Sequence, residues 1–170
     1  VMRVLELARL GGFGIAPFFI RRRLLDRVPP DRFGIFQIEA QEPGYRFRLR
    51  TTARRHDYAT LPFAEIHQLG AALQYLDKVG ITRIQEHTLG LTRRLERGLL
   101  EQGHRLFTPR GNRSSVLCFY TTRPTNRVRA AFDDAKIDAT IREGHVRLSI
   151  ALFNNSDDVD RALRVTQTLA

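Results

Sequence analysis

The stretch IDATIREGHVRLSI, residues 137–150, decides the fold because apolar and polar residues alternate on both sides of a short turn. Alternation with a period of two is typical of a strand with one buried face. Glu143-Gly144 separates the two runs and predicts a two-residue hairpin turn. The core face is expected to carry the apolar residues of both runs: Ile137, Ala139, Ile141, Val146, Leu148 and Ile150.

The register of this hairpin places two arginines on its polar face. Thr140 is expected to pair with Arg147, and Arg142 with His145. Residues directly opposite on an antiparallel pair point to the same side of the sheet. Both guanidinium groups are therefore predicted to leave the sheet on the side away from the core.

The segments around the hairpin predict a small domain of mixed helix and strand. A helix is expected to open at Asn155 or Ser156, because Asp157, Asp158 and Asp160 follow where the helix dipole favours acids, and it buries Val159, Ala162, Leu163 and Leu169. Two strands are predicted at residues 105–108 and 115–120, and a helix at 124–135 opens with a proline.

Two long helices are predicted before this domain. Apolar residues at spacings of three and four indicate helices over residues 64–79 and 81–102. Gly80 separates them, and Gly103 supplies a C-terminal cap. The predicted fold is thus α/β with an α+β small domain, in which two long helices precede a β-β-α-β-β-α order.

The N-terminal part is harder to assign from pattern alone. The glycines of residues 11–14 precede the apolar run 15–20, which is predicted as a buried strand. A dinucleotide loop needs the opposite order, with glycines after a strand, so a phosphate loop is disfavoured. Residues 21–28 predict one or two helical turns, and residues 31–62 a long connection with a short strand near 45–49.

The composition excludes several function classes. The net charge is +10, but all except two of the 28 basic residues are arginines spread along the chain, so a nucleic-acid partner is not expected. The single cysteine fits a reducing cytoplasm, which is the expected location. A membrane span and a signal peptide are not predicted, and no metal ligands are assigned.

The segments ARRHDYATLPFAEIHQLGAALQYLDKVGITRIQEHTLGLTRRLERGLLEQG (53–103) and REGHVRLSIALFNNSDDVDRAL (142–163) resemble the class V aminotransferase family of fold-type I pyridoxal-phosphate enzymes. The resemblance implies a homodimer whose small-molecule substrate is an amino acid. It implies that this chain is a C-terminal portion, with the end of the large cofactor-binding domain and a long connection at residues 1–62, and the small domain with its linking helices at 63–170.

The resemblance implies roles for four residues. Ala59 and Thr60 match a pair that reaches the cofactor phosphate of the other subunit; taken alone, Thr60 is a residue on the approach to a helix. Arg147 matches the arginine that binds the substrate α-carboxylate, and Arg142 a second arginine near that site. A planar guanidinium suits a carboxylate, although an exposed sheet arginine paired with an acid is the alternative interpretation.

The family's Schiff-base lysine has no counterpart, because no lysine precedes Lys78. Lys78 and Lys136 are interpreted as surface residues, so no catalytic residue is assigned and the chain is expected to be inactive alone. The glycines of residues 11–14 resemble the passage that follows that lysine. The alternative function is a non-catalytic dimerisation or binding module that has lost the cofactor lysine.

The turn at Glu143-Gly144 also bears on the reaction. Desulfurase members of the family carry a Gly-His-His-Cys loop between the two arginine-bearing strands, whereas here the strands are joined directly. Cys118 lies in an apolar run and is interpreted as a buried structural thiol. The resemblance therefore favours the transaminase, epimerase and lyase branch and disfavours a desulfurase.

Overall fold

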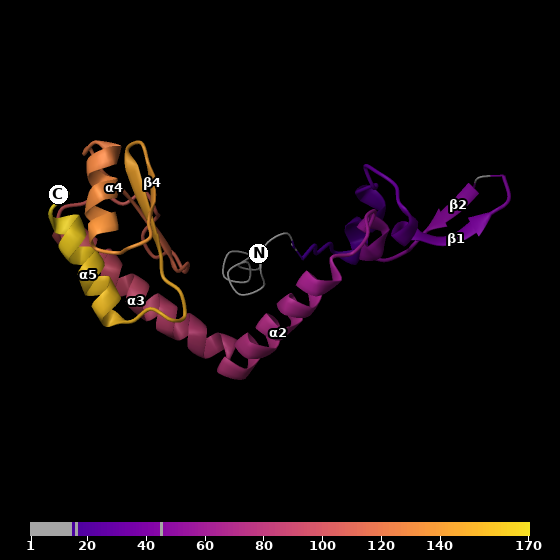
Figure 1. The fold of residues 1–170 in the computed structure, drawn as a ribbon, viewed down its shortest axis with the longest axis horizontal. Coiled ribbons are helices and arrows are strands. Elements are labelled where there is room, and N and C mark those ends of the chain that lie inside the picture. Colours follow the sequence, from indigo (N-terminus) through magenta and orange to yellow (C-terminus); the bar gives the residue numbers. More distant parts are fainter. Residues whose placement is uncertain (1–14, 16, 45) are drawn as a thin grey trace. The chain divides into compact units, whose positions relative to one another are not determined.

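The computed structural model describes residues 15, 17–44 and 46–170, which divide into two compact units, Val1–Leu76 and Asp77–Ala170 (Figure 1). The described part of the first unit contains three 3-10 helices, a hairpin and most of helix α2. Its elements are η1 (Arg22–Arg27), η2 (Ile35–Gln37), β1 (Ile38–Glu42), β2 (Arg46–Leu49), η3 (Ala53–His56) and α2 (Phe63–Val79). β1 and β2 pair antiparallel.

The second unit is a three-stranded antiparallel sheet with helices. Its elements are α3 (Ile81–Glu101), β3 (Val116–Tyr120), α4 (Thr125–Asp134), β4 (Thr140–Arg142), β5 (His145–Ser149) and α5 (Ser156–Gln167). The strand order is β3-β5-β4. The register pairs Thr140 with Arg147, Ile141 with Val146 and Arg142 with His145, so the predicted hairpin is confirmed.

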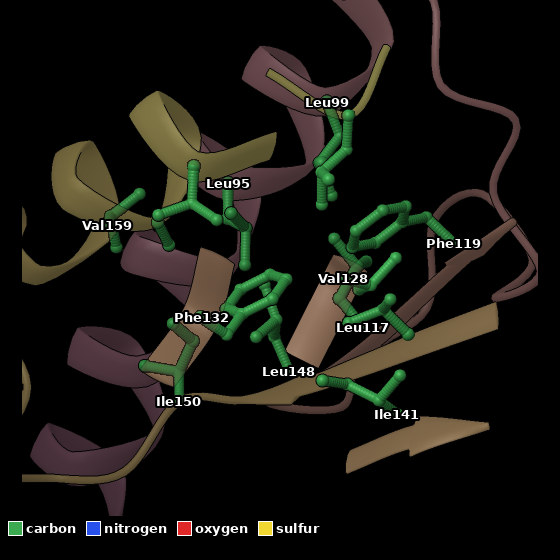
Figure 2. Packing of buried hydrophobic residues seen from close by; sticks show 14 residues of the cluster. Leu95, Leu99, Leu117, Phe119, Val128, Phe132, Ile141, Leu148, Ile150 and Val159 are labelled. Atoms are coloured by element: carbon green, nitrogen blue, oxygen red, sulfur yellow. The ribbon is translucent and has the colours of Figure 1, made fainter. Parts of the chain in front are cut away.

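The core of the second unit lies between the sheet and helices α3, α4 and α5. Figure 2 shows side chains from all of these elements converging on one apolar cluster. Phe119, Val128, Phe132 and Val146 are fully buried in it. Because β3 and β5 send alternate residues into this cluster, their remaining side chains leave from the opposite face of the sheet.

Helix α5 packs along α3 and begins at a well-defined cap. The Asn155 side chain accepts hydrogen bonds from the backbone N–H groups of Asp157 and Asp158, at 2.9 and 3.1 Å. Arg94 on α3 donates two hydrogen bonds to the Asp160 carboxylate, at 2.9 and 2.8 Å. The helix start predicted from the asparagine and the acids is confirmed.

Three predictions of local structure were wrong. The described residues of the run 15–20 form no strand, and Phe19 is 83% exposed, because no described strand pairs with them. Residues 105–108 make a single bridge, Leu106 to Phe119, in place of a full strand. The connection 31–62 contains β1 as well as the strand expected near 45–49, since β2 needs a partner for its backbone groups.

Candidate functional site

The face of the β3-β5-β4 sheet opposite the core is called here the outer face. By register and alternation it carries Val116, Cys118, Tyr120, Thr140, Arg142, His145, Arg147 and Ser149. Arg147 is exposed in the centre of this face, with Cys118 opposite it on β3 and Thr140 opposite it on β4. The structure thus places the predicted arginine on the expected side of the sheet.

The guanidinium of Arg147 is held by a neighbouring hydroxyl. Its Nη2 donates a hydrogen bond of 3.0 Å to Oγ1 of Thr140. Among the residues that the structure describes, neither Arg147 nor Arg142 forms an ion pair, so the predicted alternative of an arginine paired with an acid is not observed. Arg147 therefore has charge and N–H donors available for a carboxylate.

A chain of ring contacts borders one end of the outer face. The Phe107 ring stacks on His145 with centroids 5.8 Å apart, and it meets Tyr120 edge-on at 5.5 Å. The Arg105 guanidinium lies 4.0 Å from the centre of the Tyr120 ring. Phe107 and Arg105 come from the segment beside β3, where the N–H of Phe107 donates to the Cys118 carbonyl. The sequence pattern did not predict this arrangement.

Cys118 is 8% exposed and lies directly across the strand pair from Arg147. Burial raises the pKa of its thiol, and the positive charge of Arg147 opposes that rise. A neutral thiol is a poor nucleophile. The interpretation of Cys118 as a buried thiol is confirmed.

The second candidate region lies in the first unit, where Ala59 and Thr60 are exposed between η3 and α2. Thr60 comes three residues before Phe63, the first residue of α2. The first turn of a helix has backbone N–H groups without partners inside the helix, and these favour anions. Thr60 thus lies exposed just before this turn.

Gln37 fixes the approach to this pair, a role that the sequence did not reveal. It is fully buried, its Nε2 donates to the carbonyls of Arg32 and Arg55 at 3.0 and 2.8 Å, and its Oε1 accepts from the Gly34 N–H at 2.7 Å. Gly34 packs against the backbone of Tyr58, since an added Cβ would lie 1.7 Å from that carbonyl oxygen. These contacts position the residues just before Ala59.

Both lysines of the chain lie at helix ends and are exposed, as predicted. Lys78 is in the last turn of α2, and Lys136 follows α4 with a φ of 55°. The described residues contain no cluster of three or more His, Cys, Asp or Glu side chains able to hold a metal ion. None of their helices has both the length and the apolar character that crossing a membrane requires.

The chain is a mixed α/β protein, and its structure matches part of the fold of solved pyridoxal-phosphate proteins. The sequence profile of the aminotransferase class-V family matches residues 9–162, and the chain belongs to this family. The resemblance inferred from residues 53–103 and 142–163 is thereby confirmed.

Two curated relatives fit this assignment. An uncharacterized aminotransferase, YcbU of Bacillus subtilis, is 22% identical over 154 residues, covering 91% of this chain and 41% of the relative. A probable cysteine desulfurase 2 of Mycobacterium leprae is 27% identical over 174 residues, covering 89% of this chain and 40% of the relative. The chain thus spans about two fifths of the length of these relatives.

Solved structures share the fold. A cysteine desulfurase from Thermococcus onnurineus matches with a TM-score of 0.74 and 24% identity, over 89% of this chain and 42% of that one. C-DES, solved as a K223A mutant with glycine covalently linked to its PLP cofactor, matches with a TM-score of 0.75 and 14% identity, over 89% and 41%. At these identities the likeness shows the fold.

The comparisons do not support the expectation that a desulfurase is disfavoured. The direct connection through Glu143-Gly144 is present, and Gly144 has a φ of 76°. Nevertheless, a curated relative and a structural neighbour are named as desulfurases. The short turn alone therefore gives no ground for disfavouring a desulfurase.

Proposed function

We propose that this chain forms the C-terminal part of a pyridoxal-phosphate-dependent enzyme that acts on an amino acid. The observation that carries the proposal is the position of Arg147, which is exposed on the outer face, free of ion pairs with the described acids, and held by Thr140. In the proposal Arg147 binds the substrate α-carboxylate. A guanidinium can meet a carboxylate with two parallel hydrogen bonds, which fixes orientation as well as position.

The proposed role of Thr60 is to bind the cofactor phosphate, with the backbone of Ala59 beside it. Both residues are exposed and precede the first turn of α2, where an anion is favoured. In a homodimer this pair serves the site of the partner subunit. When bound, the cofactor supplies an electron sink for bonds broken at the substrate Cα.

The residues present fit the phosphate and carboxylate ends of the proposed site and supply no lysine for its centre. Lys78 and Lys136 are exposed at helix ends, and neither lies on the outer face. We propose that this chain binds and orients, without a covalent link of its own to the cofactor. The proposal covers the transaminase, epimerase, lyase and desulfurase reactions in a cytoplasmic enzyme.

A titration of the 170-residue chain with pyridoxal phosphate, followed by backbone NMR, tests the phosphate role. We expect the NMR signal of the Thr60 amide to shift on binding, and we expect the same shift in Thr60→Ser. The affinity for pyridoxal phosphate should fall about three- to ten-fold in Thr60→Val, because a hydroxyl donor is lost. Thr122→Val, at an exposed threonine of the other unit, serves as the matched control. Equal binding by Thr60→Val and the control would exclude this role.

The alternative function, a non-catalytic binding module, rests on the same observation that this chain supplies no lysine for the centre of the site. Borohydride reduction with one equivalent of pyridoxal phosphate, followed by mass spectrometry, tests whether either lysine of this chain bonds to the cofactor. We expect no lysine to be labelled stoichiometrically. A defined pyridoxyl group on Lys78 or Lys136 would overturn the assignment of both as surface residues.

A further inference from the structure

The outer face carries cations and no carboxylates within its strands. Among its eight residues, Arg142 and Arg147 are cationic, and none is an Asp or Glu. The nearest acids in the chain, Asp138 and Glu143, lie just before and just after β4. Like charges close together repel each other, and a bound anion offsets that repulsion.

We propose that the outer face binds a dianion, with one acidic group on Arg147 and the second on Arg142. This inference rests on the proposed function and deepens it: the amino-acid substrate carries a second acidic group in its side chain. Arg147 orients the α-carboxylate, and Arg142 with His145 distinguishes acidic from neutral side chains.

The sheet register places the two guanidinium groups within reach of one small molecule. Arg147 on β5 pairs with Thr140 on β4, and Arg142 lies two residues after Thr140 on β4. Such diagonal neighbours have Cα atoms about 7–8 Å apart and point to the same side. Two long side chains at that separation can hold the two ends of one dicarboxylate.

The Arg147 side chain is held more directly than the Arg142 side chain. Thr140 holds Arg147, and the stacking of His145 on Phe107 holds the imidazole that pairs with Arg142. The buried thiol of Cys118 leaves the β3 side of Arg147 without a competing acid. The face is therefore organised before a ligand arrives, which lowers the entropy cost of binding.

The arginines that line one cavity of the first unit behave differently. That cavity of about 610 Å³ is lined by Arg22, Arg48, Arg50 and Arg55. Arg48 pairs with Glu39 at 3.3 Å, Arg55 pairs with Asp26 at 3.4 Å, and Nε of Arg50 donates to the Phe36 carbonyl at 2.9 Å. Two of these four arginines are thus paired with acids, whereas neither Arg142 nor Arg147 has an ion pair among the described residues.

Succinate and succinamate provide matched probes, because they have the same length and differ by one charge. The experiment titrates each into the full chain at constant ionic strength and follows the side-chain Nε–H signals of the arginines by NMR. We expect succinate to shift both Arg142 and Arg147 and to bind about five- to ten-fold more tightly than succinamate, which shifts Arg147. L-aspartate and L-asparagine should show the same order.

Variants assign the preference to one side chain. Arg142→Gln should bind succinate and succinamate equally, whereas Arg129→Gln, at an exposed arginine of α4, should retain the preference. Amide spectra confirm that each variant is folded.

The outcomes separate this inference from the proposed function. Equal binding of both probes by the unaltered chain, or a preference that survives in Arg142→Gln, overturns the dianion site while Arg147 still responds to both probes. If no probe shifts Arg147, the carboxylate role fails as well, and with it the proposed function.

Discussion

Nη2 of Arg147 donates a hydrogen bond of 3.0 Å to the hydroxyl of Thr140, its direct partner across β4 and β5. Arginine side chains on a sheet surface sample many rotamers, and a single bond to a neighbouring strand removes much of that freedom. The hydroxyl leaves the charge of the guanidinium uncompensated. Thr140 is thus positioned to orient Arg147 toward an anion.

Removing this hydroxyl should weaken carboxylate binding and leave the fold unchanged. We expect Thr140→Val to bind propionate about three- to five-fold more weakly, because the hydrogen bond that orients the Arg147 guanidinium is lost. Its unfolding free energy should change by less than about 0.5 kcal/mol, since valine keeps the shape and strand propensity of threonine. Thr140→Ser should bind like the unaltered chain. Equal affinities in both variants would deny Thr140 an orienting role.

Gln37 should be the most sensitive polar residue of the first unit. Gln37→Leu leaves the Gly34 N–H and the carbonyls of Arg32 and Arg55 without their partner, which should destabilise the unit by about 2–4 kcal/mol. Chemical denaturation measures the effect, and exchange of the Gly34 amide reports it locally. Gln41→Leu, at an exposed position of β1, should cost less than about 0.5 kcal/mol. Similar losses at both glutamines would be inconsistent with this network.

Two glycines of α3 provide a matched test of its packing on α5. A Cβ at Gly98 would lie 2.5 Å from both methyl carbons of Leu163, whereas a Cβ at Gly90 would contact nothing. Gly90→Ala should raise the unfolding free energy by up to about 1 kcal/mol through helix propensity. Gly98→Ala should be about 1–2 kcal/mol less stable than Gly90→Ala, because Leu163 must move. Thermal melts that rank the two variants equally would contradict this packing.

The cap of α5 gives the second unit an acid-sensitive contribution to stability. Hydrogen bonds from the Asn154 side chain and then the Asn155 N–H lower the pKa of Asp158. A lowered folded-state pKa gives stability that is present above the ordinary aspartate pKa of about 4 and is lost as the pH falls through the folded value. Asp158→Asn should flatten the decline in unfolding free energy measured from pH 5 to pH 2. An unchanged slope would mean that Asp158 is not responsible.

The sequence predicted the elements whose signals are local. The β4–β5 hairpin follows from alternation and a two-residue turn, and α5 follows from its asparagine cap. The prediction of a buried strand over residues 15–20 was wrong because apolar composition indicates burial and says nothing about which strand supplies the partner hydrogen bonds. The prediction of a strand over residues 105–108 was also wrong. The N–H groups of Phe107 and Thr108 both donate to the single carbonyl of Cys118 and do not follow the regular pairing of a strand.

The sequence predicted one part of the candidate site and missed another. Alternation alone placed Arg147 on the outer face, because the apolar residues on both sides of it had to face the core. The burial of Gln37 could not be predicted, because a glutamine in a polar connection gives no sign that three backbone groups converge on it. Its partners Arg32 and Arg55 come from both sides of the β1–β2 hairpin.

The binding of a simple carboxylate at Arg147 tests the account most directly. Propionate is titrated into the chain at constant ionic strength while the arginine Nε–H signals are followed by NMR. We predict a saturable shift at Arg147 that weakens at least about ten-fold in Arg147→Gln and is unchanged in Arg129→Gln, because the charged fork is lost only in the first variant. Unchanged propionate affinity in Arg147→Gln would contradict the account.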